Sequence, residues 1–138
     1  MEHDTQVVIF ELNNQSYALP IVQTKEIIRV TDIVKIPRVE HYIEGIMNLR
    51  GNVIPVINLN SRLGIPDNGI TGESRIIVVG LDDKKVGLIV ERVNQIGKYS
   101  ESQVESSAVA GDNVSFIKGV IKKGESLWML LDLDELLN

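Results

Sequence analysis

The hydrophobic residues of this chain fall into short runs that are rich in β-branched side chains and are separated by polar turns. Examples are residues 7–12 (VVIFEL), 53–59 (VIPVINL) and 75–81 (RIIVVGL). Runs of this length and composition predict strands rather than helices. The polar segments at residues 13–16 (NNQS) and 82–85 (DDKK) are typical of turns that join neighbouring strands into hairpins. The pattern therefore predicts an all-β fold.

The same pattern occurs twice along the chain. Residues 10–19 match residues 79–88, apolar position for apolar position, at an offset of about 69 residues. Residues 45–63 fall on residues 119–137 at an offset of about 74 residues, with strand, turn and strand again in the same order. This periodicity predicts an internal duplication of a β unit of roughly 70 residues.

We expect one domain over residues 1–138, with a first barrel repeat at residues 1–66 and a second at residues 67–138. Many short strands closed by hairpins favour small barrels, because closure removes exposed sheet edges. A unit of this size buries too little surface to be stable alone, so the two repeats should share a core. Residues 64–74 (GIPDNGITGES) have the composition of an exposed connector between the repeats.

Individual residues mark where the expected elements end. Asn58 and Asp132 occupy equivalent positions in the two repeats, and each can cap a following helical turn. Gly64 can end the first of these turns. Pro20 and Pro55 cannot donate to a strand ladder, so each should lie at a strand edge or a bulge.

The composition narrows the functional classes. The chain has 138 residues, of which 43% are hydrophobic and 24% charged, as in a soluble globular domain. A net charge of −5 argues against phosphate binding over the whole surface. The absence of cysteine excludes disulfides, thiolate nucleophiles and cysteine metal sites. Residues 1–6 (MEHDTQ) lack the pattern of a signal peptide, and no apolar stretch reaches membrane-spanning length, which predicts a soluble intracellular protein.

Candidate catalytic and metal-binding residues are few. His3 and His41 have no histidine or acidic partner at metal-ligand spacing. The carboxylates of residues 132–136 (DLDEL) are explained as helix caps. Neither a phosphate-binding glycine loop nor a nucleophile elbow occurs in the sequence. We therefore predict no enzymatic activity, no metal and no cofactor, and keep a small enzyme with an unrecognised site as an alternative.

A nucleic-acid-binding barrel is a second alternative, but contact with another protein is the stronger interpretation. Nucleic-acid binding would need aromatic platforms, whereas Phe10, Tyr17 and Trp128 lie in strand patterns where we expect core packing. Residues 24–39 alternate charged residues with more isoleucine and valine than one buried face needs. Some of these apolar side chains should cover the junction between the repeats, line a groove or form a binding patch.

The segment 44–59 (EGIMNLRGNVIPVINL) resembles the CheW family of bacterial chemotaxis coupling proteins. The resemblance extends, in order, over residues 10–21 (FELNNQSYALPI), 26–30 (EIIRV), 74–93 (SRIIVVGLDDKKVGLIVERV) and 130–137 (LLDLDELL). It implies two five-stranded SH3-like or OB-like barrels, related by duplication, with some strands exchanged between them. It thus agrees with the repeat found in the sequence.

The resemblance implies a non-catalytic adaptor that bridges the cytoplasmic tips of methyl-accepting chemoreceptors to the histidine kinase CheA. Such a protein is cytoplasmic and is recruited to membrane receptor arrays. The positions that match the family's receptor contacts are Glu26, Ile27, Gly45, Asn48, Leu49, Arg50 and Gly51. The stretch that matches its kinase and ring contacts is Ala108, Val109 and Ala110. Alternatives within the family are the coupling domain of a CheV-type protein and an excised regulatory domain of CheA.

Arg50 stands at the crest of a predicted hairpin, and we expect it at the rim of an apolar trough that receives a helical receptor tip. An arginine offers five donors in a planar fork, and Gly51 can adopt a positive φ that keeps the turn tight. Ile27 and its neighbours would supply the trough. The alternative is that Arg50 pairs with an internal carboxylate such as Glu44 and staples its own hairpin.

Overall fold

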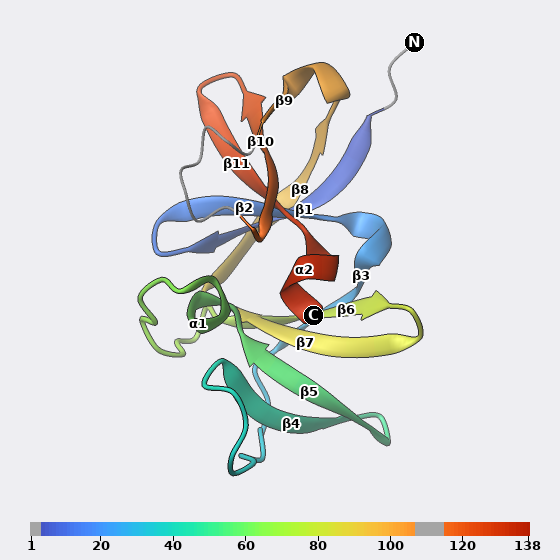
Figure 1. Ribbon diagram of the computed structural model, residues 1–138, viewed down its shortest axis with the longest axis vertical. Helices are drawn as coiled ribbons and strands as arrows, with labels where there is room; N and C mark the ends of the chain where they lie inside the picture. The colour runs from blue at the N-terminus through green and yellow to red at the C-terminus, as the bar shows by residue number, and fades with distance from the viewer. Residues whose placement is uncertain (1–3, 107–114) are drawn as a thin grey trace.

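The computed structural model describes residues 4–106 and 115–138, and these residues form two β-sheets with four short helices (Figure 1). The predicted all-β class is confirmed, although one sheet has six strands rather than five. The six-stranded sheet consists of β8 (Arg92–Tyr99), β1 (Thr5–Leu12), β2 (Gln15–Pro20), β11 (Ser126–Leu131), β10 (Ile117–Lys123) and β9 (Val104–Ser106), in that order. The five-stranded sheet consists of β3 (Thr24–Arg29), β6 (Arg75–Leu81), β7 (Lys84–Val90), β5 (Asn52–Asn58) and β4 (Ile43–Leu49), in that order. The helices are η1 (Ile21–Gln23), α1 (Leu59–Leu63), η2 (Glu101–Gln103) and α2 (Leu133–Leu137).

Each of the two sheets contains strands from both halves of the chain. The hairpin β1–β2 lies in the six-stranded sheet with β8 to β11, whereas the hairpin β6–β7 lies in the five-stranded sheet with β3 to β5. The parallel pairs β2/β11 and β5/β7 join each hairpin to its sheet at equivalent places. Each sheet therefore combines the first hairpin of one half with later strands of the other. The division into repeats at residues 1–66 and 67–138 stays a prediction.

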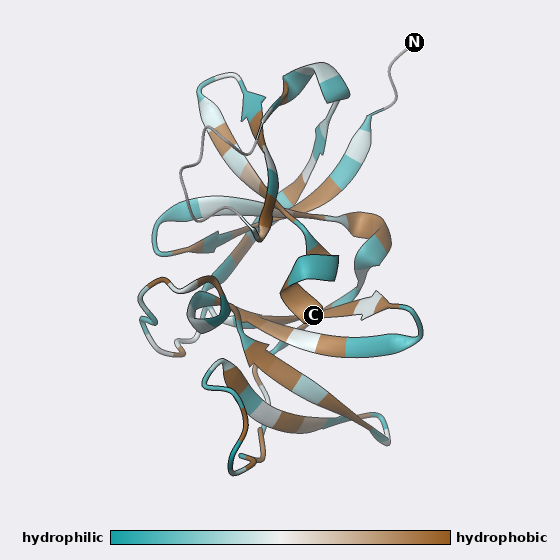
Figure 2. Cartoon of the chain, in the orientation of Figure 1, coloured by the Kyte–Doolittle hydropathy of each residue, from teal (hydrophilic) through white to brown (hydrophobic). Residues whose placement is uncertain are grey.

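Both faces of the central strands are buried, which explains the continuous apolar runs. Along β1, Val7 and Ile9 pack inside the six-stranded sheet, whereas Val8 and Phe10 point the other way, into a core shared with the five-stranded sheet. We call this shared cluster the central core. Figure 2 shows hydrophobic colour along β5 and β7 and hydrophilic colour at the β6–β7 turn. The expectation of a shared core is confirmed, as is core packing of Phe10, Tyr17 and Trp128.

The five-stranded sheet closes on itself next to Gly45. After β3 the chain runs back along β4, where Val34 exchanges two backbone hydrogen bonds with Ile46, at 2.8 and 2.9 Å. A Cβ atom on Gly45 would lie 2.2 Å from the carbonyl oxygen of Val34. Only a glycine lets the two backbones approach so closely.

The predicted helix ends are confirmed. The Asn58 side chain accepts a hydrogen bond from the backbone N–H of Ser61 at 3.1 Å, and Asp132 accepts one from Glu135 at 3.3 Å. Gly64 ends α1 with a φ of 74°. Among the prolines, Pro20 is the last residue of β2. Pro55 lies inside β5 but one residue before the pairing with β7 begins.

Candidate functional site

The turn between β4 and β5 is a two-residue hairpin made of Arg50 and Gly51. Their φ angles are 50° and 89°, and two positive values in succession match the right-handed twist of the flanking strands. The side-chain oxygen of Asn48 accepts the backbone N–H of Gly51 at 2.8 Å and so fixes the turn from within. The positive φ of Gly51 was predicted. The positive φ of Arg50 was not, because this conformation is uncommon for residues other than glycine, asparagine and aspartate.

The Arg50 guanidinium makes a two-pronged ion pair with Glu26 on β3. Nη1 donates to Oε1 at 3.0 Å, and Nη2 donates to Oε2. The contact links β3 to the β4–β5 turn across the seam where the sheet closes. The Arg50 side chain nevertheless stays 66% exposed, so the guanidinium faces solvent as well as its partner.

The ion pair shifts both titrations. The hydrogen bond from Arg50, supported by the charges of Arg50 and Lys85, lowers the pKa of Glu26 below its ordinary value of 4.5. The hydrogen bond to Glu26, and then its charge, raises the pKa of Arg50. Both groups are therefore charged throughout the physiological range, and the guanidinium is oriented before any partner arrives.

The expected internal partner of Arg50 was wrong in one respect. An internal carboxylate does hold the guanidinium, but it is Glu26 and not Glu44. Glu44 instead accepts from Lys35 at 3.4 Å and from the Asn58 side chain at 3.2 Å. The reason is that closure of the sheet brings β3 beside the turn, which local sequence spacing does not reveal.

The other sequence-predicted residues divide into an exposed and a buried group. Asn48 is exposed beside the turn, and Ile27, adjacent to Glu26 on β3, is 37% exposed. Gly45 is buried beneath the segment that closes the sheet, and Leu49 is 8% exposed in the interior of the five-stranded barrel. The contact roles of all seven positions stay predictions. Ala108, Val109, Ala110 and His3 lie outside the described residues.

A groove lined by both apolar and charged residues begins next to the Arg50–Gly51 turn. Strands β5 and β7 pair only from Val56 and Gly87 onward, and the diverging strands before that point leave two adjoining cavities of about 450 and 650 Å³. Both cavities are lined by Pro55, Lys84 and Val86, so they form one groove. The smaller cavity also has Asn52, Val53, Ile54, Asp83 and Lys85 in its wall. The larger adds Tyr42, Ile43, Ile57, Leu81, Asp82, Asp134, Leu136, Leu137 and Asn138.

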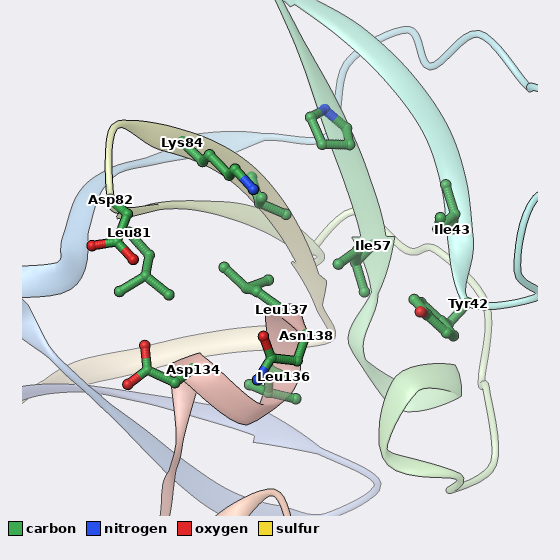
Figure 3. Close-up of a pocket in the computed structure, with 12 residues that line it drawn as sticks. Tyr42, Ile43, Ile57, Leu81, Asp82, Lys84, Asp134, Leu136, Leu137 and Asn138 are labelled. Carbon is green, nitrogen blue, oxygen red and sulfur yellow. The ribbon is translucent and has the colours of Figure 1, made fainter.

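The larger cavity is assembled from distant parts of the chain. Figure 3 shows Leu137 of α2 and Ile57 of β5 projecting toward the space between their elements, with Asp82 and Lys84 on the β6–β7 hairpin at its edge. The sequence predicted a trough supplied by Ile27 and its neighbours, whereas neither cavity has Ile27 in its wall. The groove between β5, β7 and α2 was missed, because the strand pattern identifies these elements but not their mutual placement. The short parallel pairing that leaves the strands splayed has no local signal.

Two other kinds of site were sought in the described part of the chain: metal-binding groups and membrane-spanning helices. No group of three or more histidine, aspartate or glutamate residues within it is placed to hold a metal ion. None of its helices is long and apolar enough to cross a membrane. What the geometry offers is a groove with apolar and charged walls and a fixed guanidinium beside one end.

Comparison with known proteins identifies the family. The model of the CheW-like domain matches residues 6–138. The chain belongs to the CheW-like family. Chemotaxis protein CheW of Bacillus subtilis (strain 168) is 36% identical over 135 residues, which cover 96% of this chain and 86% of that protein. Chemotaxis protein CheW of Treponema pallidum (strain Nichols) is 32% identical over 137 residues, which cover 95% and 81%.

A solved structure gives the same result for the CheW-like fold. The crystal structure of the scaffolding protein TtCheW from Thermoanaerobacter tengcongensis matches with a TM-score of 0.91 and 34% identity, over 97% of this chain and 92% of that one. The resemblance found in the sequence is therefore confirmed. These matches favour a CheW-type protein over a CheV-type coupling domain and over a nucleic-acid-binding barrel.

Proposed function

We propose that this protein is a non-catalytic, cytoplasmic chemotaxis scaffold that bridges chemoreceptor signalling tips to the histidine kinase CheA. Relatives covering nearly the whole chain are chemotaxis proteins, and a structural neighbour is a scaffolding protein. The single observation that carries the proposal is the Arg50 guanidinium, which is held by Glu26 and lies beside the end of a groove with apolar and charged walls.

On the receptor side, Arg50 supplies directed hydrogen bonds. Arginine has five N–H donors, and Glu26 takes two of them. The remaining donors are free to meet a carboxylate or amide oxygen on the receptor tip, since the side chain is largely exposed. Because Glu26 already orders the guanidinium, less conformational entropy is lost on binding.

The groove and the neighbouring apolar side chains supply the rest of the receptor contact. A helical hairpin presents an apolar stripe, which an open trough between splayed strands can receive. Val53, in the wall of the smaller cavity, is 67% exposed, and Ile27, the residue after Glu26 on β3, adds apolar surface that is 37% exposed. We assign to this face the receptor contact of Glu26, Ile27, Asn48, Arg50 and Gly51.

Gly45 and Leu49 serve the same contact indirectly. Gly45 lets the sheet close and thereby brings Glu26 to the turn, and Leu49 anchors β4 in the barrel interior beneath Arg50. Their matching family positions are thus explained as supports for the surface residues.

On the kinase side, we assign the contact to the six-stranded sheet and to the sequence positions Ala108, Val109 and Ala110, which lie outside the described residues. The described part of this sheet exposes Ile96 on β8 by 49% and Leu127 on β11 by 59%. An end-to-end contact between this face and a similar barrel of the kinase would be heterologous, and such contacts close into rings or extend into arrays.

A two-partner capture experiment tests the proposal. Immobilised protein is exposed to a receptor signalling-tip fragment, to the regulatory domain of CheA, and to both together. A scaffold retains each partner alone and both at once, because the two contacts lie on different sheets. Failure of the folded protein to retain either partner would refute the proposed function. Mutual exclusion of the two partners would refute the separate placement of the contacts.

A further inference from the structure

The connector between α1 and β6 contains the chemically labile dipeptide Asn68–Gly69. It is the single Asn-Gly pair in the sequence. Both residues are exposed, and Gly69 has a φ of 82°. An asparagine followed by glycine is the arrangement most prone to spontaneous deamidation, because glycine has no side chain to obstruct ring closure.

The reaction needs only water. The backbone nitrogen of Gly69 attacks the side-chain carbonyl carbon of Asn68, a C–N bond forms, and ammonia leaves, which gives a five-membered succinimide. Water then adds to either ring carbonyl and opens the ring, leaving an aspartyl or an isoaspartyl residue. The attacking nitrogen must lose its proton, and that N–H already donates to the carboxylate Oδ1 of Asp67 at 3.0 Å. A base is therefore in place at the nucleophile.

The Asn68 side-chain amide belongs to a hydrogen-bond network centred on the carboxylate of Glu91. Glu91 lies between β7 and β8, where the chain passes from the five-stranded to the six-stranded sheet. Its Oε2 accepts from the Asn68 side chain at 3.1 Å, from the Asn60 side chain at 2.6 Å and from the backbone N–H of Asn13 at 2.9 Å. One carboxylate thus ties the connector, α1 and the β1–β2 turn together at the junction of the two sheets.

We propose that Asn68 is a self-modification site whose conversion to aspartate or isoaspartate loosens this junction. The product replaces an amide donor with a second carboxylate facing Glu91, so an attractive contact becomes a like-charge repulsion. The connector then separates from Glu91, and the β1–β2 turn loses a part of its support. The modification is a slow, one-way change built into the chain, independent of the proposed partners.

Asn60 provides an internal comparison. It precedes Ser61, a small residue that also permits ring closure, but it is 3% exposed at the start of α1. Its amide is held by the carbonyl of Pro66 at 2.8 Å as well as by Glu91. The Asn68 side chain also makes two hydrogen bonds, to Glu91 at 3.1 Å and to Oδ1 of Asn13 at 3.4 Å, but it is exposed and precedes a glycine. The helical backbone and the burial of Asn60 keep its side chain from reaching the next nitrogen, so Asn60 should persist while Asn68 reacts.

Timed incubation at mildly alkaline pH, followed by peptide mass spectrometry, measures the modification site by site. We expect Asn68 to deamidate at least about ten times faster than Asn60, because glycine leaves ring closure unobstructed. Asn68→Gln should abolish the fast reaction, since the longer side chain forms the corresponding ring poorly. Equal persistence of Asn68 and Asn60 in the wild type would overturn the assignment of the site.

Hydrogen exchange on two fresh variants tests the consequence separately. Asn68→Asp carries the product's charge, and Asn68→Gln keeps an amide donor at the same position. We expect the Asn13 backbone N–H to exchange at least about threefold faster in Asn68→Asp than in Asn68→Gln, as for a weakened hydrogen bond. Equal exchange in the two variants would show that the charge change does not loosen the junction.

Discussion

Gly45 lies where the segment after β3 crosses β4, and its backbone touches that of Val34. Gly45→Ala would force a Cβ into the Val34 carbonyl, and its φ of 152° is unfavourable for alanine. We expect a loss of about 2–4 kcal/mol in the free energy of unfolding, measured by urea titration. Gly72→Ala is the matched control, because a Cβ at Gly72 meets no atom within 4 Å. Equal stabilities of the two variants would contradict this account of closure.

Glu26 makes the stability of the fold depend on pH. Its pKa is lowered in the folded state by Arg50, so its contribution is present above the unfolded pKa near 4.5 and is lost as the pH falls through the folded value. Glu26→Gln removes this pH-dependent contribution to stability. Urea titrations below pH 5 should therefore show a shallower loss of stability with falling pH in Glu26→Gln than in the wild type. Parallel curves would show that the ion pair does not contribute in solution.

Residue-level chemistry was predictable where it is local. The caps at Asn58 and Asp132, the end of α1 at Gly64 and the positive φ of Gly51 follow from short sequence patterns, and all are present. The partner of Arg50 was not predictable, because Glu26 reaches the turn only through closure of the sheet. Glu44 is nearer in sequence, yet it lies in the network around Asn58.

At the scale of elements, α2 depends on a cation supplied by α1. A five-residue helix is unstable alone, and its last carbonyl groups lack partners within the helix. Arg62 donates to the carbonyl oxygens of Leu136 at 2.8 Å and Glu135 at 3.3 Å. Its guanidinium also lies 4.5 Å from the ring centres of both Tyr42 and Phe116. Arg62 thus fastens α2, which forms one wall of the groove, to the five-stranded barrel.

Arg62→Ala should release this helix. We expect a loss of about 1–3 kcal/mol in the free energy of unfolding and faster amide exchange in α2, because charged hydrogen bonds and two cation–π contacts disappear together. Arg75→Ala is a suitable control, since Arg75 donates to the carbonyl groups of Gly72 and Ser74 in its own turn. Unchanged exchange in α2 of Arg62→Ala would show that packing alone holds the helix.

The strands and hairpins were predictable from alternation and turn chemistry, but their assembly was not. The hairpins β1–β2 and β6–β7 have similar apolar patterns, so pattern alone cannot say which set of later strands each one joins. The short parallel pairs, such as Val56 with Gly87 and Met129 with Tyr17, determine which sheet each hairpin joins. These pairs involve few residues far apart in sequence, and only the family resemblance pointed to the exchange of strands.

At the scale of the whole molecule, the exchanged hairpins should make unfolding a single event. Neither sheet can lose its strands without opening the central core, to which both sheets contribute. Trp128, the one tryptophan, lies inside the six-stranded sheet and reports on it by fluorescence, whereas circular dichroism reports on both sheets. The two probes should give coincident urea transitions. Separate transitions would show that the sheets unfold independently.

The central core, to which both sheets contribute, could also couple the two proposed binding faces of the scaffold. A scaffold changes kinase activity only if it contacts the kinase states differently, because equal binding to both states shifts no population. The groove takes walls from the five-stranded sheet and from α2, and Leu136 of α2 also packs in the central core. A receptor tip in the groove would therefore touch the core that both sheets share.

The most direct test of the account is calorimetric titration of a receptor signalling-tip fragment into the wild type and two arginine variants. Arg50→Ala should weaken binding by about 1–3 kcal/mol, or roughly five- to 150-fold, because an oriented charged hydrogen bond at the interface is lost. Arg92→Ala, which removes an exposed arginine paired with Glu73 at 2.6 Å on the six-stranded sheet, should bind as the wild type does. A folded Arg50→Ala protein with wild-type affinity would contradict the central claim.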